Sequence, residues 1–257
     1  MGEDTSFKDH FSDRAGEYTR YRPGYPSVLF YWLAKQTVHH DTAWDCGCGN
    51  GQAAIQLTPH YRRLLATDPS RQQIEKALPH ERITYSVASA EESGLADGGI
   101  DLIVVAQALH WFDFERFYRE VRRVAKPGGV LAAISYGEVR VEGAPDKIVS
   151  HFYHDIIGPY WPPERRYVDE GYESIPFPFE EIEAPAFTMQ IEWNLEQLNG
   201  YLGTWSAFKE YELRKGRNPL DLIGAELKTA WSDPETPRRV SWPLTLKVGR
   251  VGKQGLE

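Results

Sequence analysis

The chain has 257 residues, of which 41% are hydrophobic, and its formal net charge is −8. This is enough material for one sizeable core, and the scattered acidic residues disfavour a nucleic-acid partner. No apolar run approaches the ~20 residues of a membrane-spanning helix, so no membrane contact is expected.

The first predicted element is a helix that begins near Ser27, after an aromatic segment and the extended turn at Arg22–Pro26. Residues 1–13 are polar and contain no signal-peptide core. The only two cysteines, Cys46 and Cys48, lie too close together for a good disulfide. These features lead us to expect a cytoplasmic protein.

A glycine-rich turn follows the first predicted strand. Residues 42–46 run into Gly47, Gly49 and Gly51, and a helix-compatible segment starts at Gln52. Glycine adopts positive φ and lets a ligand lie against bare backbone, while a helix start offers unpaired N–H groups. The Gly-x-Gly-x-Gly spacing differs from the Gly-x-Gly-x-x-Gly of dinucleotide sites. The turn therefore predicts a site for a ligand other than a dinucleotide.

Two acidic residues indicate which ligand this is. Asp45 precedes the glycines by two positions, and a carboxylate there can pair with an ammonium group, directly or through water. Asp68 ends the next strand, 17 residues after Gly51, where a ribose diol would lie across neighbouring strand ends. An amino-acid head combined with a ribose indicates S-adenosylmethionine as the cofactor.

The fold class predicted from the alternating pattern is α/β. Strands are expected at about 42–46, 62–68, 83–89, 100–107 and 128–136, separated by helical stretches, with two more at 187–193 and 240–248. This order predicts a Rossmann-like, seven-stranded and mostly parallel sheet with helices on both faces and helical cap insertions. Pro243 has no N–H, so regular pairing of the last strand is expected to start near Leu244.

The domain organisation that we expect is a single domain over residues 1–257. Its cofactor-binding core would be 37–137, and 182–193 and 240–252 would supply the final strands. Residues 138–181 and 194–235 would form cap insertions on the substrate side.

A set of motifs in a specific order carries a family resemblance over roughly residues 40 to 136. They are Asp45–Gly51, Asp68–Ser70, Ala88–Glu91, Gln107–Phe112 and Val124–Gly129. On these motifs the chain resembles the class I S-adenosylmethionine-dependent methyltransferases, and within them the small-molecule branch that includes trans-aconitate methyltransferase-like (methyltransferase type 11) proteins. The resemblance implies a fold and a cofactor but names no substrate.

The predicted cofactor-binding residues gather at the strand ends. They are Asp45, Gly47, Cys48, Gly49, Gly51, Asp68, Pro69, Ser89, Ala90 and Gln107, with Tyr18 and Arg22 from the N-terminal segment. The resemblance implies that Ser89 and Ala90 lie beside adenine and that the N-terminal segment folds over the cofactor. Two alternatives stay open: the N-terminal aromatics only attach their segment to the core, and Glu91 and Glu92 begin a following helix.

The predicted acceptor site lies beyond the central strand. His110 and Trp111 would face the acceptor, together with Tyr21, Trp205 and one arginine of the cap, Arg165 or Arg166. A carboxylate acceptor needs no base, whereas a phenol, alcohol or amine would need one, and His110 is the candidate catalytic residue. The alternative is that His110 satisfies loop backbone while Trp111 fills the core.

No metal is expected, because the polar side chains of His151, His154 and Asp155 suit a solvated helix face better than a metal site. The predicted function is methyl transfer from S-adenosylmethionine to a small molecule, at a carboxylate or other oxygen. A non-enzymatic S-adenosylmethionine-binding protein and, with less support, a nicotinamide-dependent oxidoreductase are the alternatives. Both a monomer and a homodimer are compatible with the sequence.

Overall fold

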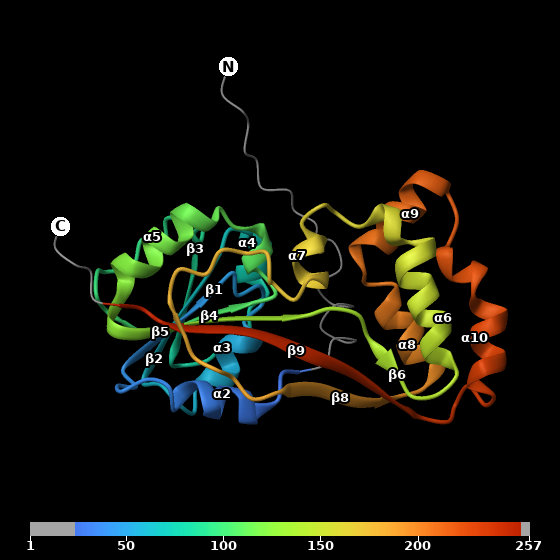
Figure 1. Cartoon of the computed structure of the whole chain (residues 1–257), viewed down its shortest axis with the longest axis horizontal. Coiled ribbons are helices and arrows are strands. Elements are labelled where there is room, and N and C mark those ends of the chain that lie inside the picture. The colour runs from blue at the N-terminus through green and yellow to red at the C-terminus, as the bar shows by residue number, and fades with distance from the viewer. Residues whose placement is uncertain (1–23, 253–257) are drawn as a thin grey trace, which may run out of the picture.

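A computed structural model of the chain describes residues 24–252, and its centre is one twisted sheet. Five parallel strands, on the left in Figure 1, make up one half of it. Their order in the sheet is β3-β2-β1-β4-β5. Their bounds are β1 Thr42–Cys46, β2 Arg63–Asp68, β3 Ile83–Val87, β4 Ile100–Ala106 and β5 Ala125–Tyr136. This parallel half confirms the predicted α/β fold class, and the carboxyl ends of its strands share one edge.

The other half of the sheet is antiparallel and is built on one long strand, β9 (Arg238–Arg250). It pairs with β5 and with β8 (Phe187–Trp193), so all seven predicted strands are present. Two strands of two residues each, β6 (Arg140–Val141) and β7 (Glu180–Glu181), also pair with β9 and bring the described sheet to nine strands.

The expectation that pairing in β9 starts at Leu244 is wrong. Pro243 lies opposite Thr188 of β8, within a ladder that runs from Arg238 to Leu244. On its other side β9 changes partner here, from β5 at Leu244 to β6 at Ser241. On that side Pro243 lies between the two partner strands, so its missing N–H interrupts no ladder there. The pairing with β8 therefore continues through Pro243.

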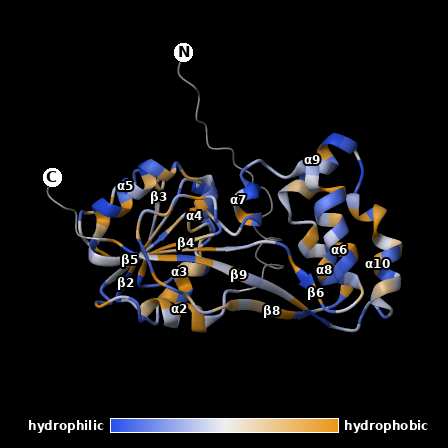
Figure 2. Ribbon diagram, viewed as in Figure 1, coloured by the Kyte–Doolittle hydropathy of each residue, from blue (hydrophilic) through white to orange (hydrophobic). Residues whose placement is uncertain are grey.

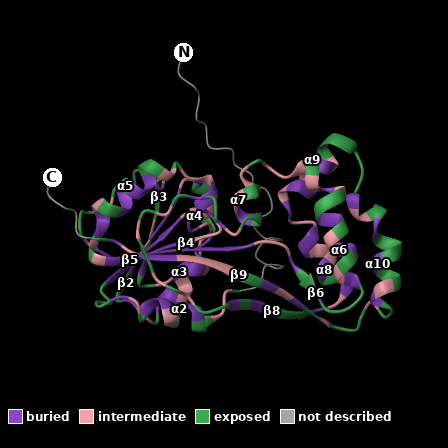
Figure 3. Ribbon diagram, viewed as in Figure 1, coloured by how far each residue is buried: buried purple, intermediate pink, exposed green. Residues whose placement is uncertain are grey.

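Helices cover both faces of the parallel strands, as predicted. Along β4 the buried residues alternate: Leu102 and Val104 belong to a cluster with α2 (Ser27–Ala34) and α3 (Gln52–Leu57). Ile103 and Val105 belong to a cluster on the other face, with α5 (Phe114–Val124). Because both faces are covered, the central strands are buried throughout, as Figure 3 shows.

The helical pattern between strands is interrupted once. A short helix, α4 (Arg71–Glu75), lies between β2 and β3, but residues 88–99 between β3 and β4 contain no helix. The alternative that Glu91 and Glu92 begin a helix is therefore wrong. Gly94 and Gly98 adopt φ of 70° and 58°, and these left-handed turns are incompatible with a continuous helix.

A second group of helices lies beyond the carboxyl ends of β4 and β5, and we call it the helical body. It contains α6 (Pro145–His151), η3 (Phe152–Ile156), η4 (Gly158–Tyr160), α8 (Leu195–Leu202), α9 (Ser206–Lys215), η5 (Pro219–Leu222) and α10 (Gly224–Trp231). These elements come from the two segments predicted as cap insertions, and they share one hydrophobic cluster. Figure 2 shows that the helices of the helical body carry both hydrophobic and hydrophilic residues.

One short helix of the first insertion lies between this body and the sheet (Figure 1). α7 (Arg165–Asp169) packs against η2 (Leu109–Trp111), the turn just after the central strand β4. Figure 1 shows α7 between the sheet and the helical body. No helix within residues 24–252 has the length and apolar composition needed to cross a membrane.

Candidate functional site

All three glycines of the turn after β1 adopt the left-handed backbone conformation. The φ angles of Gly47, Gly49 and Gly51 are 70°, 53° and 87°. A Cβ atom on Gly47 would lie 2.7 Å from Ala108 Cβ, and one on Gly51 would lie 2.2 Å from the Tyr85 hydroxyl. Packing and backbone geometry both require glycine at these two positions.

Gly49 differs from the other two glycines because space lies beside it. The nearest atom to a Cβ placed there is Gln73 Oε1, at 4.0 Å. The backbone of the turn is therefore bare at Gly49, as a ligand lying against it requires. The neighbouring Cys48 is buried, and burial raises the pKa of its thiol well above the usual range, so it packs as a neutral side chain.

Asp45 is fully buried at the end of β1, beneath the turn. Its Oδ2 accepts a hydrogen bond of 2.9 Å from the Ala54 backbone N–H at the start of α3. Its Oδ1 is buried and accepts no hydrogen bond from any residue between 24 and 252. Burial raises the pKa of this carboxyl to about 7. A buried carboxyl oxygen without a donor fits a ligand that brings an ammonium group.

Asp68 connects the end of β2 to the glycine turn. Its Oδ2 accepts from the Gly49 N–H at 2.8 Å, and its Oδ1 accepts from the Ser70 N–H at 2.9 Å. The carboxylate thus fixes the backbone of the turn, a role that its position in the sequence did not reveal. Pro69, between these contacts, is half-buried.

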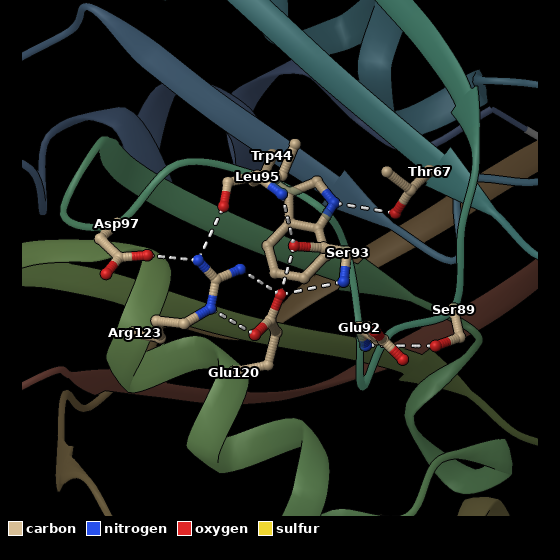
Figure 4. Close-up of polar contacts among 9 residues, drawn as sticks. All are labelled: Trp44, Thr67, Ser89, Glu92, Ser93, Leu95, Asp97, Glu120 and Arg123. Carbon is tan, nitrogen blue, oxygen red and sulfur yellow. Dashed lines mark hydrogen bonds and ion pairs between the residues drawn. The ribbon is translucent and has the colours of Figure 1, made fainter.

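The loop after β3 carries Ser89 and Ala90 and is anchored to α5 rather than to a helix of its own. Glu120 of α5 accepts from the Ser93 backbone N–H at 2.9 Å and from the Ser93 hydroxyl. Figure 4 shows Arg123 beside it, bonded to Glu120, Asp97 and the Leu95 carbonyl. Arg123 therefore helps to anchor this loop.

Within this loop the two predicted adenine neighbours differ in exposure. The Ser89 hydroxyl accepts from the Glu92 N–H at 3.1 Å, and Ala90 is buried in the cluster with α5. Glu91 accepts from the Asp113 N–H at 3.0 Å and so joins this loop to the start of α5.

Gln107 follows β4 and adopts a φ of 57°, unusual for a residue other than glycine. A non-glycine residue held in such a conformation costs about 1 kcal/mol or more, and such residues gather at functional sites. Its amide nitrogen donates to the Tyr136 carbonyl at 2.8 Å, which leaves its Oε1 as the acceptor of the side chain. The surrounding strands β4 and β5 hold this geometry.

His110 is buried in η2 and is bonded to a residue of the first insertion. Its Nδ1 lies 3.0 Å from the Tyr172 hydroxyl. Burial, and then the positive charge of Arg165, lower the pKa of His110 to about 3. The imidazole is therefore neutral at ordinary pH and is a weak base. Trp111 is half-buried, with its ring centroid 4.9 Å from that of His110.

Tyr172 is not among the site residues predicted from the sequence. It is fully buried and, after Gly171 at φ 60°, itself adopts φ 61°. No local pattern signals a contact with His110, because the chain between them passes through the helical body. The alternative that His110 satisfies loop backbone is not supported by this side-chain partner.

The structure brings most of the predicted site residues to one edge of the sheet, at the carboxyl ends of its parallel strands. These are Asp45, Gly47, Cys48, Gly49, Gly51, Asp68, Pro69, Ser89, Ala90, Gln107, His110 and Trp111. Trp205 instead packs inside the helical body, against Phe152, Tyr153 and Trp161. Only 5% of Trp205 is exposed, so its ring serves that core. The predictions for Tyr18, Tyr21 and Arg22 fall outside the described residues.

Comparison with known proteins agrees with this arrangement. Residues 44–133 match the family model of the methyltransferase domain. The chain is 32% identical to a Dictyostelium discoideum protein described as a methyltransferase, over 88% of both chains. It is 34% identical to a Mycobacterium tuberculosis protein also described as a methyltransferase, over 48% of this chain and 51% of that one.

A solved structure is similar over nearly the whole described chain. It is a protein from Anaeromyxobacter dehalogenans described as a type II methyltransferase, 46% identical, with a TM-score of 0.86. The match covers 90% of this chain and 99% of that one.

Proposed function

We propose that this chain, which belongs to the class I S-adenosylmethionine-dependent methyltransferase family, transfers the methyl group to an oxygen atom of a small-molecule acceptor. Family membership gives the reaction type and the cofactor, and it favours methyl transfer over both alternatives left open by the sequence. The small molecule and its oxygen are our proposal.

The residues that hold the cofactor in this proposal are those at the carboxyl ends of the parallel strands. The bare backbone at Gly49 receives the methionine part, and the unpaired Oδ1 of Asp45 accepts from its ammonium group. Asp68 lies at the next strand end, where it accepts from the ribose hydroxyls. Ser89 and Ala90 border the adenine, and Oε1 of Gln107 faces the methionine part.

The acceptor in this proposal lies beside His110 and α7. S-adenosylmethionine supplies an activated methyl group, whose bond to sulfur breaks as its bond to the acceptor oxygen forms. Such an in-line displacement depends mainly on alignment and on exclusion of water. A carboxylate attacks without losing a proton, whereas the neutral His110, with a pKa of about 3, is a poor base for an alcohol. This pKa is the observation that favours a carboxylate as the acceptor group.

The first experiment is a calorimetric titration of the purified protein with S-adenosylhomocysteine. We expect a dissociation constant in the micromolar range or tighter. This corresponds to a binding free energy of about −8 kcal/mol or more favourable. Transfer from S-adenosylmethionine labelled in its methyl group is then measured with small carboxylic acids, phenols and amines. Labelling of amines alone would refute oxygen transfer, and absence of binding would refute the cofactor site.

A further inference from the structure

Arg165, at the start of α7, has donor groups for which residues 24–252 supply no acceptor. Its Nε donates to the Tyr153 hydroxyl at 2.7 Å and to Asp169 Oδ1 at 3.1 Å. Neither of its terminal nitrogens donates to any residue within 24–252. Only 18% of the side chain is exposed. Among the described residues, the buried side-chain atoms without a partner include no atom of Arg165, so its terminal nitrogens reach solvent and are open to an anionic ligand.

The guanidinium is fixed in place by its surroundings. It lies 4.7 Å from the ring centroid of Trp161 and 5.4 Å from that of Tyr153. Tyr153 belongs to the π-helical segment η3, a geometry found often at functional sites. The ion pair with Asp169 completes the support. Since the Nε side is occupied by Tyr153 and Asp169, the terminal nitrogens are left to face a ligand.

The place of Arg165 in the fold is next to the site already described. α7 packs against η2, the turn that carries His110, and the charge of Arg165 acts on the imidazole. Figure 1 shows α7 between the sheet and the helical body. Arg165 and the carboxyl ends of the parallel strands therefore border the same region.

We infer that Arg165 binds a planar anionic group of the acceptor through its two terminal nitrogens and is the residue that selects anionic over neutral acceptors. This inference rests on the proposed function and makes it more specific. A guanidinium presents two parallel N–H donors that match the two oxygens of a carboxylate. Its neighbour Arg166 is exposed and, within the part of the chain that the structure describes, donates only to the hydroxyl of Tyr167, so it has no comparable setting.

The experiment measures binding of acids and their neutral amides to protein saturated with S-adenosylhomocysteine. Three matched pairs are titrated by calorimetry: benzoate and benzamide, cinnamate and cinnamamide, hexanoate and hexanamide. We expect at least one acid to bind about 10-fold or more tightly than its amide. In Arg165→Gln this ratio should fall to about one, while the affinity for S-adenosylhomocysteine stays unchanged. Arg165→Lys should keep only part of the preference, because it keeps the charge but loses the paired donors.

Arg166→Gln is the matched control, because it removes an arginine from the adjacent position of the same helix, and it should keep the wild-type ratio. The inference is overturned if no acid binds, if acids and amides bind alike, or if Arg165→Gln keeps the preference for acids. Methyl transfer to neutral phenols or alcohols in preference to acids would also overturn it, yet would leave the proposed oxygen transfer standing. Failure of the wild type to bind S-adenosylhomocysteine would instead refute the proposed function itself.

Discussion

The Nδ1 atom of His110 lies 3.0 Å from the hydroxyl of Tyr172, a residue 62 positions later in the chain. Burial raises the pKa of Tyr172 well above its usual value, so the phenol stays protonated. The left-handed backbone at Gly171 and Tyr172 fixes the direction of the ring. The contact thus joins the turn after the central strand to the first insertion and orients the imidazole.

Replacing Tyr172 by Phe removes the hydroxyl and keeps the ring. We expect stability to fall by about 1 kcal/mol, since one buried hydrogen bond is lost. We expect kcat/KM to fall roughly 10-fold, because the imidazole that borders the proposed acceptor site is no longer held in position. The affinity for S-adenosylhomocysteine should not change. Steady-state kinetics measures kcat/KM and calorimetry measures the affinity. Tyr167→Phe is the control, because that hydroxyl accepts from the exposed Arg166. An unchanged kcat/KM would show that the orientation of His110 is irrelevant to the reaction.

Replacing Asp68 by Ala removes the two hydrogen bonds that hold Gly49 and Ser70 and the acceptor that we assign to the ribose. We expect affinity for S-adenosylhomocysteine to fall by about 100-fold, equivalent to ~2.7 kcal/mol. Asp68→Asn, which keeps the shape and one acceptor oxygen, should lose less. Calorimetric titration measures both variants, and an unchanged affinity in Asp68→Ala would disprove the ribose assignment.

The glycines of the turn should respond differently to alanine. A Cβ on Gly51 would meet Tyr85 at 2.2 Å, so Gly51→Ala should lose about 2 kcal/mol or more of stability. A Cβ on Gly49 meets no atom nearer than 4.0 Å, so Gly49→Ala should lose only about 1 kcal/mol. It should nevertheless bind S-adenosylhomocysteine poorly, because the methyl fills the space beside the bare backbone. Urea unfolding and calorimetry separate the effects; equal loss of stability in both variants would contradict this prediction.

Binding of S-adenosylhomocysteine should release a proton from Asp45. Burial raises the pKa of Asp45 from 3.8 to about 7, so below that pH the free protein holds the carboxyl largely neutral. An ammonium group lowers this pKa again, and the proton leaves on binding. Calorimetry at about pH 6 in two buffers of different ionisation enthalpy counts the protons, and Asp45→Asn should release none. The same release in both proteins would assign the proton to another group.

The same pKa gives a prediction for stability. Because the folded pKa of Asp45 lies above the unfolded value of 3.8, its contribution to stability is full below pH 3.8 and is lost as pH rises through about 7. As pH rises from 3.8 to about 7, the free energy of unfolding of Asp45→Asn should therefore decrease less than that of the wild type. Thermal unfolding across this range measures the difference.

Glu120 should contribute more to stability than its exposed neighbours on α5. It is buried, accepts from Ser93 and pairs with Arg123, and these contacts hold its pKa below the usual value although burial raises it. Glu120→Gln should lose about 2 kcal/mol, because the ion pair that it breaks is partly buried, with the Glu120 side chain 8% and that of Arg123 36% exposed. Glu115→Gln is the control, since that side chain is 91% exposed and should change stability by less than about 0.5 kcal/mol. Urea unfolding measures both, and equal losses would refute an anchoring role for Glu120.

The sequence alone determined the parallel sheet, the glycine turn and the cofactor. Each of these rests on signals that lie close together in the chain, such as the apolar run of β4, the three spaced glycines and an acid near the end of both β1 and β2. Parallel strands bring their carboxyl ends to one edge of the sheet. The sequence alone therefore predicts that Asp45, Gly49 and Asp68 lie close together.

The tertiary structure decided what depends on contacts between distant segments. The sequence could not choose between Arg165 and Arg166, because only the packing of α7 buries one and exposes the other. The bond from Tyr172 to His110 and the continuous pairing at Pro243 likewise depend on how insertions return to the sheet. Trp205 belongs to the core of the helical body for the same reason: burial is a property of packed neighbours, and sequence spacing does not record it.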